Sequence, residues 1–162
     1  MTQIGRAVTE HVLGLLAGNT GVNASLDELA KTGGHVPAHI RLFLGMNVSA
    51  ELLEKANQAQ YPAVMVYCER LNNTLEEKFR TFAGQARVTV EIRNSEDRIE
   101  GVNRGSLVYS DLICALLEQA RGQWSDFSWF GGKYEVTYQA VKAGGKQFVQ
   151  STKVTFEVDV SI

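Results

Sequence analysis

The residues of this chain that could support metal chemistry are few. His35 and His39 are four residues apart, a spacing that can place two imidazoles on one face of a helix and suits a metal ion. Pro37 lies between them, and no cysteine or carboxylate is close to them in the sequence. We therefore expect a loop with two ordinary histidines, and neither a metal site nor a cofactor.

Two glycine–lysine pairs resemble the start of a phosphate-binding loop. Gly132-Lys133 is followed by Tyr134, and Gly145-Lys146 is followed by Gln147. A P-loop needs a Ser or Thr hydroxyl after the lysine, to bind magnesium, and it opens a helix. Both pairs lack the hydroxyl and precede strand-like sequence, so we interpret them as hairpin turns.

The two cysteines offer little support for nucleophilic catalysis. Cys68 and Cys114 lie in apolar surroundings, inside a predicted strand and a predicted helix. A thiol in such a position is usually buried and inert. We expect both thiols to be reduced and not to form a disulfide.

An acidic cluster lies on the connection between a predicted strand and a predicted helix, and it consists of Glu96, Asp97 and Glu100, with Arg98 among them. Carboxylate pairs can perform glycosidase or metal chemistry, but this interleaved pattern favours a solvated, charged loop. One alternative is a small soluble enzyme whose cleft lies between the N-terminal helices and the sheet. Its acid–base groups would be Glu96, Asp97, His35 or His39.

The elements that must position these residues form one domain with two parts. Residues 1–60 are expected to be a helical N-terminal portion, although residues 39–45 are also apolar enough for a strand. Residues 61–162 are expected to be the sheet-plus-helix core. The prediction is a single α+β domain over residues 1–162: a mostly antiparallel sheet with one long helix packed on a face, preceded by the N-terminal helical segment.

Within residues 61–162 the patterns are distinct. The clearest helix covers about residues 104–121, with a broad apolar stripe and Asn103 as its cap. Residues 87–93 alternate like a half-buried strand, and Gly84 before them predicts a bulge or a break. The final residues, from about 133 on, predict a long β-hairpin with one face on the core and the other on water or on a polar partner.

The composition of the chain excludes several classes of function. The chain has 162 residues, of which 44% are hydrophobic and 21% charged, which is typical of a globular protein. The net charge of −2 argues against a protein whose main task is to neutralise nucleic-acid phosphate. The sequence has no secretory signal and no apolar run of about 18–20 residues, so no membrane partner is expected.

Two features point to contacts between proteins. Four large aromatic residues gather in one turn region: Trp124, Phe127, Trp129 and Phe130. Such rings fill a core or cover a neighbouring chain, because aromatic residues are concentrated at dry interfaces. The tip of the predicted hairpin carries Lys142 and Lys146 and is a natural arm for a partner.

Four stretches of the chain together resemble a protein family: "YPAVMVYCE", "FAGQARVTVEIRNSEDRIEG", "LVYSDLICALLEQ" and "WFGGKYEVTYQAVKAGGKQFVQSTKVTFEVDV". They resemble the tail-terminator or neck (head–tail joining) proteins of long-tailed bacteriophages. The most specific piece is "GGKQFVQSTKVTF", and the resemblance covers residues 61–162 well and residues 1–60 loosely. In that family a helical portion precedes a small α+β domain that ends in paired strands.

The resemblance implies a structural protein of the virion and no enzymatic activity. Such proteins form rings, usually hexamers, at the head-proximal end of a tail, where they stop polymerisation of the tail tube and dock the head. The implied partners are further copies of the chain, the tail tube protein and head–tail connector proteins. DNA passes through the ring without sequence-specific binding, and no cofactor is implied. The protein would be made in the bacterial cytoplasm and become part of the tail or neck of the virion.

The sequence also leaves other functional hypotheses open. One is a head-completion or connector protein on the head side of the joint, and another is a host-encoded ligand-binding or scaffold domain.

A ring requires two different surfaces on each copy. We expect the polar face of the sheet to supply one, the aromatic turn with the hairpin tip to supply the other, and residues 94–104 to contact the ring below. The candidate interface residues are Arg93, Glu96, Asp97, Arg98, Glu100, Trp124, Phe127, Trp129, Phe130, Lys142, Lys146 and Lys153.

Overall fold

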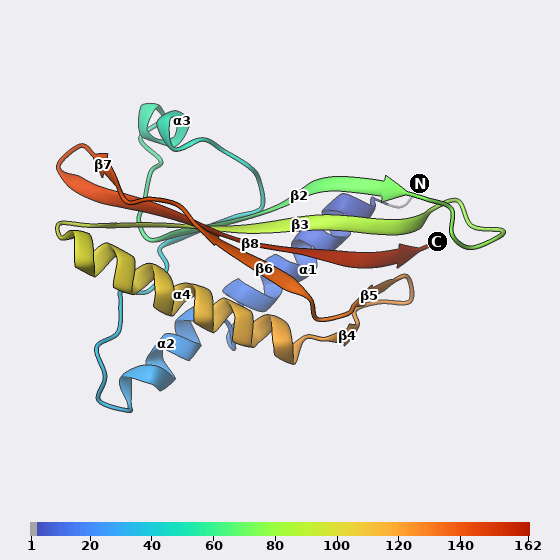
Figure 1. The fold of residues 1–162 in the computed structure, drawn as a ribbon, viewed down its shortest axis with the longest axis horizontal. Coiled ribbons are helices and arrows are strands. Elements are labelled where there is room, and N and C mark those ends of the chain that lie inside the picture. Colours follow the sequence, from blue (N-terminus) through green and yellow to red (C-terminus); the bar gives the residue numbers. More distant parts are fainter. Residues whose placement is uncertain (1–2) are drawn as a thin grey trace.

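The computed structural model describes residues 3–162, which build four helices around one long, twisted sheet (Figure 1). The helices are α1 (Ile4–Ala17), α2 (Val22–Ala30), α3 (Ala50–Lys55) and α4 (Ile99–Gln119). The strands are β1 (Leu42–Leu44), β2 (Ala63–Asn73), β3 (Ala83–Glu96), β4 (Gly122–Gln123), β5 (Ser128–Phe130), β6 (Tyr134–Tyr138), β7 (Lys142–Gly144) and β8 (Gln147–Ser161).

The strands form one sheet in the order β1-β2-β3-β8-β5-β4, and β6 and β7 also pair with β8. β1 runs parallel to β2, and every other pair is antiparallel. The α+β prediction is therefore confirmed in outline: helices combine with one large sheet, and the strands dominate. The parallel β1 lies within residues 39–45 of the N-terminal portion, which the sequence left open between helix and strand.

One face of the sheet carries the main core. β3 and β8 pair along almost their whole lengths, and on this face the apolar side chains of both strands are buried. On the paired strands these buried apolar residues are Ala86, Val88, Val90, Ile92, Val154, Phe156, Val158 and Val160. Three helices share this face, since α1, α2 and α4 place Val12, Leu26 and Ile113 in the same cluster. The long helix α4 is thus one of three on its face.

The opposite face is covered over part of its length by the segment between β1 and α3, where the carbonyl oxygen of Val48 lies against Arg93. Ala63, Met65 and Tyr67 of β2 form a small second cluster there, packed against Leu42 and Leu44 of β1. Figure 1 shows α3 set apart from the other three helices. Apolar residues on both faces explain why the start of β2 reads as an unbroken hydrophobic run.

The start of α4 differs from the sequence-based prediction. The helix begins at Ile99, with Arg98 as the residue before it, so Asn103 lies inside the helix and is not its cap. Residues 94–96 belong to β3, which leaves no loop over 94–104. The fully buried Val102 anchors this first turn in the core. Gly101 and Gly105 lowered the helical signal of these turns, because glycine is a poor helix former.

Two glycines mark places where backbone and side chains approach closely. A Cβ at Gly105 would lie 2.6 Å from Nδ2 of Asn94, which donates a hydrogen bond to the carbonyl oxygen of Val102. A Cβ at Gly84 would lie 1.9 Å from the carbonyl oxygen of Asn72. β3 is continuous through Gly84, so the expected break is absent, and the one register shift between β2 and β3 lies on β2, between Cys68 and Arg70.

We predict opposite effects for the same substitution in two helices. Gly105→Ala should lower the free energy of unfolding by about 1–3 kcal/mol, because the new methyl group displaces the buried, hydrogen-bonded Asn94. Gly14→Ala in α1 is the matched control, since Gly14 is exposed and has nothing within 4 Å of the added Cβ. It should raise stability by up to about 1 kcal/mol. Urea unfolding measures both, and stabilisation by Gly105→Ala would refute the close contact.

Candidate interaction surfaces

The hairpin predicted at the C-terminal end is confirmed. Lys142 pairs with Val149, Gly144 pairs with Gln147, and Gly145 and Lys146 form a two-residue turn with Gly145 at φ 78°. Positive φ favours glycine at this position. All residues from 142 to 147 are exposed, and we call them the hairpin tip.

The four aromatic residues of the turn at 124–130 divide into two roles. Phe130 is buried and its ring lies 5.2 Å from that of Phe156. Trp124 stacks on His11 of α1 at 4.4 Å, and burial lowers the pKa of this histidine. In contrast, Phe127 and Trp129 are 47% and 52% exposed. Two rings therefore belong to the core, and two remain available to a partner.

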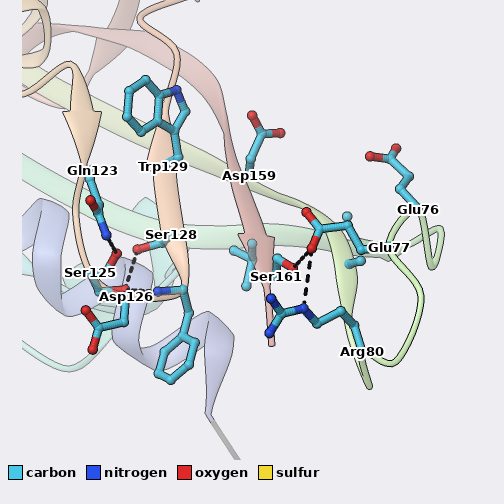
Figure 2. A pocket seen from close by; sticks show the side chains of 14 residues that line it. Glu76, Glu77, Arg80, Gln123, Ser125, Asp126, Ser128, Trp129, Asp159 and Ser161 are labelled. Atoms are coloured by element: carbon cyan, nitrogen blue, oxygen red, sulfur yellow. Dashed lines mark hydrogen bonds and ion pairs between the residues drawn. The ribbon is translucent and has the colours of Figure 1, made fainter.

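A hollow of about 470 Å³ lies beside the exposed rings of this turn (Figure 2). It is bounded by residues 76–84, which form the connection after β2 and the first two residues of β3, by residues 123–129, and by the end of β8. We call it the end groove. Its charged lining residues are Glu76, Glu77, Arg80, Asp126 and Asp159. Phe127 and Trp129 also line it, so the groove combines aromatic surface with an excess of carboxylates.

Contacts between distant parts of the sequence hold the groove together. Ser161 Oγ donates to Glu77 Oε2 at 2.7 Å, and Arg80 Nε lies 3.3 Å from the same oxygen (Figure 2). The amide of Thr81 donates to the carbonyl oxygen of Ile162 at 2.8 Å. Sequence reasoning missed Glu76, Glu77 and Arg80, because only the pairing of β3 with β8 brings this loop to the aromatic turn.

The hairpin tip and the aromatic turn do not form one surface, which corrects the sequence-based model. The tip pairs with β8 at Gln147, whereas β5 of the aromatic turn pairs with Val160 and Asp159. These positions are near opposite ends of β8, and Figure 1 shows β7 and β5 toward opposite ends of the molecule. The length of β8, which extends about 3.3 Å per residue, separates them.

The charged residues 96–100 lie at the same end of the sheet as the hairpin tip. Glu96 pairs with Phe148 at the end of β3, and Ser95 Oγ donates to Gln147 Oε1 at 3.1 Å. Asp97, Arg98 and Glu100 are exposed at the turn into α4 and in its first turn. These predicted site residues are therefore accessible beside the tip, although they occupy a strand end and a helix start and not a long loop.

Arg93 is the clearest error among the predicted interface residues, because its side chain is only 9% exposed. Arg93 Nε donates to Glu91 Oε2 at 2.7 Å, and its Nη2 donates to the carbonyl oxygen of Val48 at 2.6 Å. Tyr67 donates to the other oxygen of Glu91 at 3.1 Å. Lys153 lies at the edge of this network, 42% exposed and 3.9 Å from Glu91. The segment before α3 covers this part of the polar face.

Of the residues considered for chemistry, His35 is exposed, His39 lies beside a carboxylate, and Cys68 and Cys114 are partly and fully buried. His39 Nε2 lies 2.6 Å from Asp27 Oδ1, with both side chains exposed. Burial raises the pKa of the Cys68 and Cys114 thiols, which lowers the fraction of reactive thiolate. Within residues 3–162 no three His, Cys, Asp or Glu side chains are grouped to hold a metal ion. No helix in the same range is long and apolar enough to cross a bilayer.

Comparisons with known proteins add no relative: no family model matches the sequence, and no curated protein matches it. The function is therefore inferred from the surfaces described above together with the resemblance of residues 61–162.

The buried network predicts very different costs for two arginine substitutions on the same strand face. Arg93→Met should destabilise the fold by about 3 kcal/mol, because it leaves the buried Glu91 without its main ionic partner. Arg87→Met removes an arginine that lies 2.7 Å from Glu69, but both side chains are more than one-third exposed. This control should cost less than about 1 kcal/mol. Equal costs in urea unfolding would contradict the network.

Stability should also fall at alkaline pH through Tyr67. Burial, and then the Glu91 carboxylate, raise the pKa of Tyr67 above the ordinary value of 10.0. The folded state holds this proton more tightly than the unfolded state. The contribution of Tyr67 to the free energy of unfolding is therefore fully present below about pH 10 and is lost as the pH rises further. Tyr67→Phe should make the slope of unfolding free energy against pH shallower by up to about 1.4 kcal/mol per unit. An unchanged slope between pH 10 and 12 would exclude this contribution.

Proposed function

We propose that this chain is a structural virion protein that forms a ring at the head-proximal end of a phage tail. The ring ends polymerisation of the tail tube and docks the head, and DNA passes through it without sequence-specific binding. Its partners are further copies of the chain, the tail tube protein and the head–tail connector proteins. The resemblance of residues 61–162 to tail-terminator and neck proteins suggested this function.

The observation that carries the proposal is the difference between the two ends of the long sheet. One end presents the exposed hairpin tip with two lysines, and the other presents the end groove with Phe127, Trp129 and several carboxylates. Copies in a closed ring meet through two different patches, so a ring subunit needs two unlike surfaces. An elongated chain with unlike ends meets this requirement.

The charge of the chain is compatible with a passage for DNA. The formal net charge is −2. A strongly basic channel would bind the phosphate backbone and hold the DNA back, because each neutralised phosphate releases counterions and adds affinity. A nearly neutral subunit avoids this retention.

Electron microscopy of particles assembled without this protein tests the function. Overlong tails, or tails without heads, are expected, because nothing would then stop the tube or join it to the head. In tails and heads purified separately, the protein should be found with the tails. Its presence on heads alone, with tails of normal length, would instead assign it to the head side as a completion or connector protein. Normal particles would refute both assignments.

A further inference from the structure

We propose that neighbouring copies join head to tail, with the hairpin tip of one copy seated in the end groove of the next. This contact rests on the proposed ring function and specifies which surfaces build the ring. The hairpin tip comprises residues 142–147, and the end groove lies between residues 76–84, residues 123–129 and the end of β8.

A single copy cannot fill its own groove. Gln147 pairs with the tip, and Asp159 pairs with Trp129 beside the groove. Both residues belong to β8, which is one continuous strand. At about 3.3 Å per residue they are about 40 Å apart along that strand. Contact between the tip and the groove therefore requires a second copy.

The two surfaces have opposite charge. The groove is lined by four carboxylates and one arginine, which gives 1 − 4 = −3. Arg80 is engaged with Glu77, which leaves Glu76, Asp126 and Asp159 to attract a cation. The tip contains Lys142 and Lys146 and no acidic residue. Complementary potentials of this kind steer two surfaces together and fix their register.

The shapes and side-chain types are also compatible. Gly144 and Gly145 keep the tip narrow, and a Cβ at Gly144 would lie 2.2 Å from Cγ2 of Val149. Phe127 and Trp129 are about half exposed in the groove. Aromatic faces attract ammonium groups and accept the methylene stems of lysine. The groove thus offers the lysines of the tip both aromatic surface, for their methylene stems, and carboxylates, for their ammonium groups.

The carboxylates beside the tip limit how deeply it enters. Glu96 pairs with Phe148, and Asp97 follows at the exposed turn into α4. Both would repel the acidic groove of a neighbour, so only the end of the hairpin is inserted. The contact is heterologous: each copy uses its tip on one side and its groove on the other, and a ring results when the rotation closes.

Zero-length cross-linking of the assembled wild-type protein tests the contact directly. A carbodiimide joins lysine to a carboxylate only where the two groups touch. Mass spectrometry should find Lys142 or Lys146 linked to Asp126, Asp159 or Glu76. Because the tip and the groove of one copy are about 40 Å apart, each such link must join two copies. Assembled rings without any of these links would overturn the proposal.

A charge exchange provides the second test. The tip variant carries K142E and K146E, and the groove variant carries D126K and D159K, all at exposed positions. Each variant alone should fail to assemble, because both of its contact surfaces then have the same sign. An equimolar mixture should assemble, because every contact between alternating copies again joins opposite charges. Sedimentation velocity measures this, and thermal melts check that both variants fold.

A control with the same change in net charge as the tip variant separates loss of a specific contact from a general effect of the added negative charge. Lys31→Glu with Lys55→Glu changes two exposed lysines outside the tip and the groove, and this variant should assemble like the wild type. If the wild type forms rings and the equimolar mixture does not, the proposed contact is wrong and the ring function stands. If the wild type stays monomeric both alone and on tail tubes, the ring function fails as well.

Discussion

The register between β3 and β8 is the constraint on which the rest of this structure depends. Val90 lies opposite Val154 on the helix-covered face, while Glu91 lies opposite Lys153 on the other face. A slip of one residue would move every apolar side chain of β8 from the core to the exposed face. The same register places Ser161 beside Glu77 and Gln147 beside Ser95, so it also builds both ends of the molecule.

The two faces of this strand pair are stabilised in different ways, one by apolar packing and the other by a buried ion pair. On one face, apolar side chains from α1, α2 and α4 close over the sheet. On the other, the buried ion pair between Glu91 and Arg93 is held by Tyr67 and by the backbone at Val48. Breaking such a buried pair is costly, because either partner would remain charged and poorly solvated. The covering segment before α3 is therefore tied to the sheet by polar contacts as well as by packing.

Local patterns in the sequence predicted the features that depend on neighbouring residues. The alternation in β8 and the apolar stripe of α4 follow from periods of two and 3.6 residues. The two-residue turn at Gly145 follows from the tolerance of glycine for positive φ. Features set by distant residues were missed. Arg93 looks like a surface residue by parity alone, and only the fold shows Val48 against it. The end groove joins residues 76–84 to Ser161, a relation that no local pattern encodes.

The continuous β8 strand also has a mechanical consequence. Its ladders with β3 and β6 are antiparallel, so their hydrogen bonds lie perpendicular to the strand direction. A pull along the length of the strand then loads many of these bonds in shear at the same time, whereas a pull across the sheet would open them one after another. If copies join through the two ends of β8 as we propose, tension along the chain of copies would act along that strong direction.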